Sequence, residues 1–237
     1  MKQSRFLVFR SVLVCVLAFT VVSCSDDVDD ATQKMQTAEA LSDSLLTVTD
    51  MPQGWEETQR QVFEKRGNEN PSIDPSIWCP AAQKTAAPLV ALAGDSGADV
   101  EMSASQGGGK GASMMRLQAW SNKDAAEYYT TAALAAEKCD GVTTTDADGV
   151  TTRINLITGK TLGDESVSWS ERVDPPAAVS SEKFSSIGRT TVARFGSIIM
   201  VLQLGDAASS DSVSLMDETK WWGIVTAAGN KLAKVGS

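Results

Sequence analysis

The sequence contains no histidine, and this absence removes several kinds of active site. Without imidazole the chain can form neither a Ser-His-Asp nor a Cys-His catalytic arrangement, and it cannot bind zinc through histidine. A Cys-x-x-Cys pair is also missing, so thiol redox chemistry is not expected. Basic residues are few: 21 Lys and Arg stand against 30 Asp and Glu, for a net charge of -9. Because nucleic-acid binding needs a clustered basic surface, we expect no nucleic-acid partner.

The amino terminus has the pattern of a secretory signal. Lys2, Arg5 and Arg10 precede an uncharged, largely apolar run from Ser11 to Val22. This run is shorter than the roughly 20 apolar residues that a membrane-spanning helix needs. Residues 1–23 are therefore predicted to be a signal peptide.

The signal ends in Val21-Val22-Ser23-Cys24, which resembles a bacterial lipobox. The resemblance implies that the Cys24 thiol is acylated with a diacylglycerol, of which palmitate is a usual component, and that Cys24 becomes the first residue of the mature chain. Two acyl chains give stable anchoring, so we expect a protein on the extracytoplasmic face of the cell membrane. An ordinary secretory signal with a coincidental cysteine is the alternative. Residues 24–32 are rich in aspartate and are predicted to be a solvated acidic tether.

Cys79 and Cys139 are the two cysteines that follow Cys24 in the sequence. In an exported chain, two such cysteines most simply form a disulfide bond. Two buried free thiols are the alternative.

The pattern of apolar residues predicts an α+β fold with a largely antiparallel sheet and helices packed on it, in one domain over residues 33–237. Pro88 is expected to kink or split the second helix, and Gly196 to form a tight hairpin turn. Residues 206–212 are expected to be a polar loop. Helices are predicted over residues 33–46, 81–93, 121–138 and 213–235, and strands over residues 59–65, 99–105, 112–120, 149–158, 166–173, 187–195 and 197–204.

Three short motifs suggest chemistry, and none is convincing. Ser180 and Lys183 have the S-x-x-K spacing of serine acyl enzymes, but no S-D-N or K-T-G motif follows. Gly159-Lys160-Thr161 mimics the end of a P-loop, but Ile154 occupies the position of the required glycine. The glycine cluster at residues 107–111 fits a hairpin turn better than an anion-binding nest. We therefore predict no catalytic residue, no metal site and no cofactor.

The six tryptophans are expected to differ in their roles. Trp55 and Trp221 are the better candidates for lining a cleft, although a structural role is an open alternative for both. The others are expected to face the core or the sheet: Trp78, Trp120, Trp169 and Trp222.

Three segments together resemble one known family. They are the stretch from Leu45 to Trp55 (LLTVTDMPQGW), the helix from Tyr128 that ends in Cys139, and the segment Leu162-Gly163-Asp164-Glu165-Ser166. They are similar to actinobacterial lipoproteins related to the PknH-type extracellular sensor domain, over roughly residues 40–235. The resemblance implies a sheet-and-helix domain outside the cytoplasmic membrane, with a cleft for a small ligand. The extracellular sensor domain of that kinase has two disulfides, whereas this chain can form one, and this chain has no kinase segment.

The expected function is that of a non-catalytic envelope lipoprotein that binds a small molecule or a cell-wall fragment. The sequence does not predict which residues bind that ligand. The first alternative is an adaptor that docks on a membrane or envelope protein without a ligand pocket. The second is a serine hydrolase that works without histidine.

Overall fold

The computed structural model describes residues 35–63, 78–94, 96–106, 111–174, 176, 184–209 and 216–236. The predicted signal peptide (residues 1–23), the tether with Cys24 (residues 24–32) and the Ser180–Lys183 motif lie outside the described residues. The same is true of most of the glycine cluster, residues 107–110.

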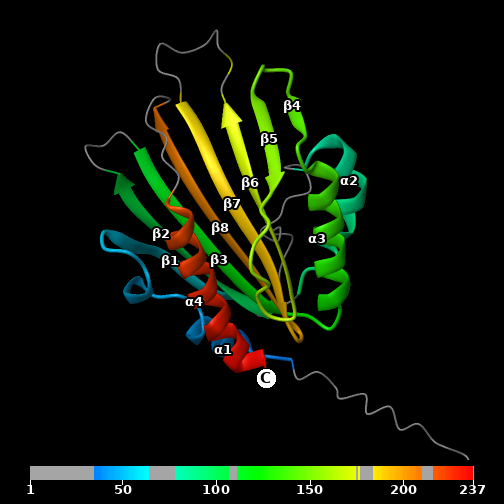
Figure 1. Ribbon diagram of the computed structural model, residues 1–237. Helices are drawn as coiled ribbons and strands as arrows, with labels where there is room; N and C mark the ends of the chain where they lie inside the picture. Colours follow the sequence, from blue (N-terminus) through cyan, green and yellow to red (C-terminus); the bar gives the residue numbers. More distant parts are fainter. Residues whose placement is uncertain are drawn as a thin grey trace, which may run out of the picture. The chain divides into compact units, whose positions relative to one another are not determined.

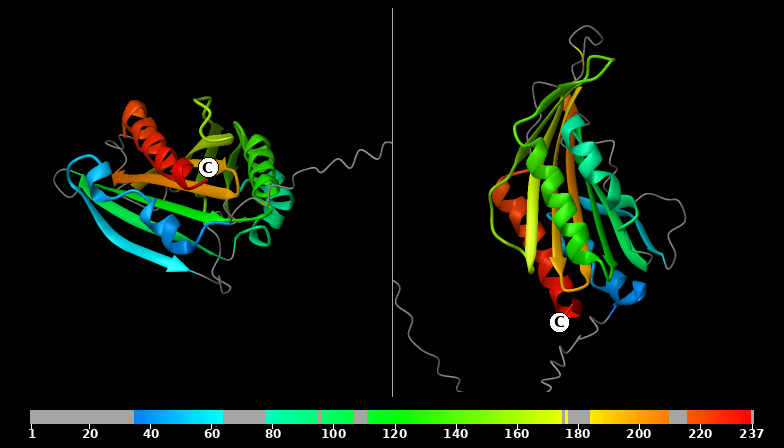
Figure 2. Two further views of the ribbon diagram at one scale, coloured as in Figure 1. Left: turned by 90° about the horizontal axis from the view of Figure 1, so that it is seen from below. Right: turned by 90° about the vertical axis from the view of Figure 1, so that its right-hand side faces the viewer.

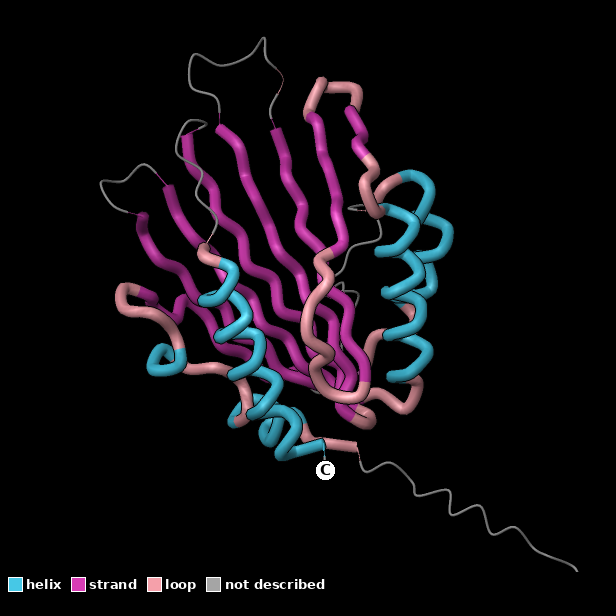
Figure 3. The backbone as a smooth tube through the Cα atoms, viewed as in Figure 1, coloured by secondary structure: helices cyan, strands magenta, loops and turns pink. Residues whose placement is uncertain are grey.

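Eight strands form one antiparallel sheet in the order β1-β2-β3-β8-β7-β6-β5-β4 (Figure 3). Helices pack against this sheet, so the predicted α+β class with a largely antiparallel sheet is confirmed (Figure 1). The strands are β1 (Trp55–Phe63), β2 (Ser96–Gln106), β3 (Gly111–Ser121), β4 (Thr143–Thr145), β5 (Thr151–Leu156), β6 (Glu165–Asp174), β7 (Phe184–Phe195) and β8 (Ile198–Ser209).

The central hairpin of the sheet is formed by β7 and β8. Phe195 pairs with Ile198 across a two-residue turn, where Gly196 has a φ of 59°, a left-handed conformation that glycine adopts without a steric penalty. The predicted hairpin is therefore confirmed. The polar loop expected over residues 206–212 is wrong for residues 206–209, because β8 continues to Ser209, paired with β7 along its whole length and with β3 as far as Ala208; residues 210–212 lie outside the described residues. The short strand β4 was not predicted.

Both faces of the sheet are buried near its centre, because alternate residues of a strand point to opposite sides. On one face, Met200 and Leu202 belong to a core that includes α1 (Ala38–Asp43) and α4 (Glu218–Gly236). On the other, Ile199 and Val201 belong to a core that includes α2 (Pro80–Ala86) and α3 (Ala125–Cys139). Figure 2 shows α2 and α3 side by side, away from α4.

The helices depart from the predicted boundaries in two ways. The first helix covers Ala38–Asp43 rather than residues 33–46, and a separate 3-10 turn, η1, follows at Val48–Asp50. The second predicted helix is split, as expected at Pro88, into α2 and the 3-10 helix η3 (Ala87–Val90). Proline favours such a break because its ring removes a backbone donor and clashes with the preceding turn.

A disulfide joins Cys79 to Cys139, with a Cα–Cα separation of 5.7 Å. Cys79 directly precedes α2, and Cys139 is the last residue of α3. The bond therefore ties together the two helices that cover one face of the sheet.

None of the helices within the described ranges combines the length and the apolar character that crossing a bilayer would require.

Candidate functional site

A hollow, which we call the trough, lies on the face of the sheet that carries α2 and α3. Its floor contains Gly188 of β7 and Gly205 of β8, which are paired neighbours. In the same row, Met114 pairs with Gly205 on one side and Glu171 pairs with Gly188 on the other. Three strand spacings of about 4.8 Å place Met114 and Glu171 roughly 14 Å apart, so two adjacent glycines leave a gap between two longer side chains.

The trough has a volume of about 370 Å³, at the small end of the range for ligand pockets. It lies toward the end of the sheet where β6 and β8 end and where β3 and β7 begin, the upper end in Figure 1. The next row of the sheet adds small or apolar side chains from the same four strands. The trough is lined by Ala112, Met114, Glu171, Val173, Ser186, Ile187, Gly188, Gly205, Asp206 and Ala207.

The two glycines of the floor are not required by close packing. A Cβ atom built on Gly205 would have no neighbour within 4 Å, and one built on Gly188 would meet its nearest atom at 3.8 Å. Neither residue has a positive φ. Their effect is therefore to leave space above the sheet.

Glu171 is the titratable side chain on the trough's glycine row. It is half-buried, and this burial raises the pKa of its carboxyl group above the ordinary value. Among the described residues, no side chain forms a hydrogen bond or ion pair with Glu171. The wall opposite is Met114, a large apolar side chain that is 62% exposed. The trough thus combines apolar walls with one carboxylate for which the described part of the chain supplies no counter-charge.

The nearest basic residue on the same face of β3 is already neutralised. Arg116 lies two residues from Met114, and its Nη2 atom is 2.8 Å from Oδ2 of the buried Asp99. Its Nε atom is 3.3 Å from the carboxylate of Glu101. Two acids therefore hold this guanidinium group, and it remains with them rather than with Glu171.

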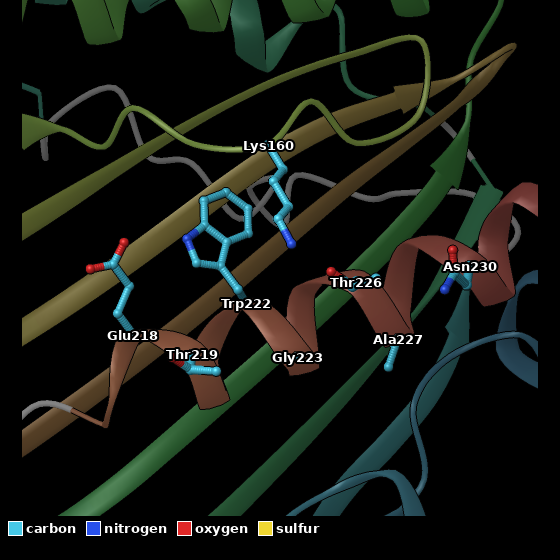
Figure 4. Close-up of a pocket in the computed structure, with 8 residues that line it drawn as sticks. All are labelled: Lys160, Glu218, Thr219, Trp222, Gly223, Thr226, Ala227 and Asn230. Atoms are coloured by element: carbon cyan, nitrogen blue, oxygen red, sulfur yellow. The ribbon is translucent and has the colours of Figure 1, made fainter.

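A second, more open hollow of about 660 Å³, which we call the α4 groove, runs along the outer side of α4 (Figure 4). The indole of Trp222 stands at its centre, with Lys160 from the loop between β5 and β6 on one side and Glu218 on the other. The groove is lined by Lys160, Glu218, Thr219, Trp222, Gly223, Thr226, Ala227 and Asn230.

The predictions for the tryptophans are partly confirmed and partly wrong. Trp78, Trp120 and Trp169 are buried, as expected. Trp55 and Trp221, the better candidates for a cleft, are 6% and 0% exposed and belong to the core, so the structural role given as the alternative holds for both.

Trp222 is half-buried and packs against the core of this face, as expected, but it also lines the α4 groove, which was not predicted. The buried side of α4 includes Val225, Gly229 and Leu232, and of the two adjacent tryptophans it is Trp221 that is fully buried. The spacing of Trp222, Thr226 and Asn230 by four residues was a usable signal, because it places the second indole on the polar side of the helix.

The described part of the chain contains no cluster of three or more potential metal ligands among its Cys, Asp and Glu side chains.

No protein-family model and no curated protein matches the chain. Among solved structures, it is similar to the extracellular domain of PknH from Mycobacterium tuberculosis, with 10% sequence identity and a TM-score of 0.48, covering 86% of this chain and 98% of that one. It is also similar to LpqN, a protein involved in cell envelope biogenesis of Mycobacterium tuberculosis, with 13% identity and a TM-score of 0.29, covering 78% of each chain. The first of these is the type of domain that the sequence motifs resemble.

Proposed function

We propose that this protein is a lipid-anchored, non-catalytic binding protein of the extracytoplasmic membrane face, and that it holds a small amphiphilic cation in the trough. The observation that carries the proposal is the Glu171 carboxylate, which borders an unfilled apolar hollow and has no counter-charge among the described residues.

The proposed location on the extracytoplasmic membrane face rests on the amino-terminal sequence. The charged start, the apolar run and the lipobox-like segment ending in Cys24 occur in the order of a lipoprotein signal. Acylation of Cys24 anchors the mature chain, and the acidic tether that follows separates the folded domain from an anionic membrane surface by like-charge repulsion.

The ligand class follows from the chemistry of the trough. An ammonium group beside Glu171 supplies the missing counter-charge, and partial burial makes this attraction stronger than it is in bulk water. The apolar part of the ligand lies over the glycine floor and contacts Met114 and Val173. Displacing water from these walls adds a favourable hydrophobic contribution.

The distribution of exposed apolar residues favours ligand binding over an adaptor surface. An adaptor needs a contiguous apolar patch. The exposed large hydrophobic residues of the described part lie on separate segments: Met35, Val48, Val62, Val90, Met114 and Leu134. Of these, Met114 lines the trough.

The proposal is tested with three probes that share a benzyl or phenyl group but differ in charge: benzylammonium, benzyl alcohol and benzoate. We expect the mature lipoprotein, held in nonionic detergent, to bind benzylammonium at least tenfold more tightly than benzyl alcohol in calorimetric titrations. Glu171→Gln removes this preference, because it keeps the shape of the side chain and removes its charge. Gly205→Val fills the trough and abolishes binding of both probes.

Glu127→Gln is the matched control, since Glu127 is an exposed acid on α3. It is expected to leave all three affinities unchanged. Benzoate binding as tightly as benzylammonium, or an unchanged preference in Glu171→Gln, contradicts the proposal. Because protonation of Glu171 removes its charge, the affinity for benzylammonium also rises as the pH increases through the raised pKa of this carboxyl group.

A further inference from the structure

The α4 groove presents several ligand-binding groups along one side of a helix. Thr219, Gly223, Thr226 and Asn230 recur at spacings of three and four residues, so they share a face. Gly223 and Ala227 lie between the longer side chains and give the groove its depth. The hydroxyl groups and the amide both donate and accept hydrogen bonds.

The loop that carries Lys160 is closely fitted to α4. A Cβ atom on Gly229 of the helix would lie 2.6 Å from the side chain of Leu162, and a Cβ atom on Gly159 would lie 2.0 Å from the indole of Trp222. Two glycines thus allow the loop and the helix to approach at the positions that flank Lys160. The loop is also held from the other side, since the backbone N–H of Leu162 donates to Oγ of Ser166 at 2.8 Å.

The two charged side chains that flank the indole, Lys160 and Glu218, do not form an ion pair with each other. Lys160 and Glu218 point from opposite sides of Trp222, and neither forms an ion pair with another described residue (Figure 4). The first backbone donors of α4 are already occupied, because Oδ1 of Asp217 accepts from the N–H groups of Thr219 and Lys220. An anion in the groove is therefore held by Lys160 rather than by the helix terminus.

We propose that the α4 groove binds a sugar ring that bears a carboxylate. The flat apolar side of the ring stacks on the indole of Trp222, and the carboxylate pairs with the ammonium group of Lys160. Glu218 accepts hydrogen bonds from ring hydroxyls on the far side of the indole, and Thr226 and Asn230 bind the edge of the ring. This site is separate from the trough, and its ligand has the opposite charge.

The test compares three sugars of similar size: glucuronate, which is acidic, glucose, which is neutral, and glucosamine, which is cationic. Binding to the mature lipoprotein is followed by the NMR signal of the Trp222 indole N–H, assigned with Trp222→Phe. We expect glucuronate to bind at least fivefold more tightly than glucose, and Lys160→Gln to make the two affinities equal. Lys84→Gln is the matched control, because Lys84 is an exposed lysine on α2.

The proposal is overturned if glucosamine binds more tightly than glucuronate, or if Lys160→Gln retains the preference for glucuronate. Loss of the preference in Lys84→Gln also overturns it, because the effect then follows net charge rather than the groove. A further titration with an oligogalacturonide distinguishes a polymeric glycan from a free sugar as the ligand. Tighter binding of tetragalacturonate than of galacturonate indicates a polymeric glycan, and equal binding of the two indicates a free sugar.

Discussion

The glycines of this protein serve two opposite purposes at the level of single residues. Gly205 and Gly188 leave room that nothing fills, whereas Gly159 allows the indole of Trp222 to approach the backbone. The same residue type therefore creates a hollow on one face of the sheet and permits close packing on the other.

This difference predicts opposite responses to one added methyl group. Gly159→Ala places its Cβ atom 2.0 Å from the indole and is expected to lower the free energy of unfolding by about 1–3 kcal/mol, the usual cost of overpacking. Gly205→Ala is the control and is expected to be neutral or slightly stabilising, because its Cβ atom meets nothing within 4 Å. Urea unfolding of both variants measures the difference. Equal stability of the two variants contradicts the close approach of the loop to α4.

At the level of elements, contacts at both of its ends fix α4 on the sheet. Near its start, Nη1 of Arg189 donates to the carbonyl of Met216 at 3.0 Å, and the guanidinium lies 5.3 Å from the Trp221 ring centre. Near its end, Nζ of Lys231 pairs with Oδ2 of Asp50 in η1. The helix that forms the α4 groove is thus held against both the sheet and the amino-terminal segment.

The ion pair near the end of α4 predicts a pH-dependent contribution to stability. Burial alone would raise the pKa of Asp50, but hydrogen bonds from Lys231 and Thr47 outweigh it and hold the pKa below its ordinary value. A carboxyl group with a lowered folded-state pKa stabilises the fold above its unfolded pKa, and loses this effect as the pH falls through the folded value. Asp50→Asn is therefore expected to cost about 0.5–1 kcal/mol at pH 7 and progressively less as the pH falls through the lowered pKa of Asp50. Acid and neutral denaturation curves check this, and a pH-independent cost contradicts it.

The disulfide between α2 and α3 makes a second prediction for these elements. The two cysteines are 60 residues apart in the sequence. In the chain-entropy model, a link that closes a loop of this length stabilises the fold by about 4 kcal/mol. The Cys79→Ala/Cys139→Ala double variant is expected to lose most of this stability in urea unfolding. A thiol titration of the denatured, unreduced chain should find neither of these cysteines free. Two reactive thiols at these positions would refute the bond.

For the whole molecule, the two proposed sites lie on opposite faces of one sheet. The trough shares its face with α2 and α3, and the α4 groove lies on the outer side of the helix that covers the other face. Because the central strands β7 and β8 contribute to both cores, a rigid sheet separates the two hollows. The binding of one ligand is not expected to require the other.

The proposed lipid anchor is tested in the chain that carries the predicted signal peptide and Cys24. Cys24→Ala keeps the signal but removes the thiol that the lipobox-like segment presents for acylation. We expect radiolabelled palmitate to enter the wild-type protein in its bacterial host and to be absent from the variant. The Cys79→Ala/Cys139→Ala protein serves as the control and should remain labelled. Label in Cys24→Ala would show that another residue is acylated, and an unlabelled wild-type protein would show that the proposed anchor is absent.

Patterns along the sequence determined the elements whose signals are local. The alternation of β2 and β3, the hairpin at Gly196 and the break at Pro88 were predicted because period-two burial, glycine and proline act on neighbouring residues. Boundaries were less accurate: β8 extends past residue 206 because pairing with β3 and β7 outweighs a polar sequence.

The tertiary structure alone decided where the hollows lie. Gly188 and Gly205 become a trough because the register of β7 and β8 places them side by side, and register joins residues that are distant in sequence. Which tryptophan of α4 is fully buried was settled in the same way, since Trp221 and Trp222 are equally apolar and contact with the sheet buries Trp221 completely and Trp222 only in part. The sequence by itself determined the acidic charge, the absence of imidazole chemistry and the predicted cellular location. These properties depend on the type and order of the residues and not on the tertiary contacts of the folded chain.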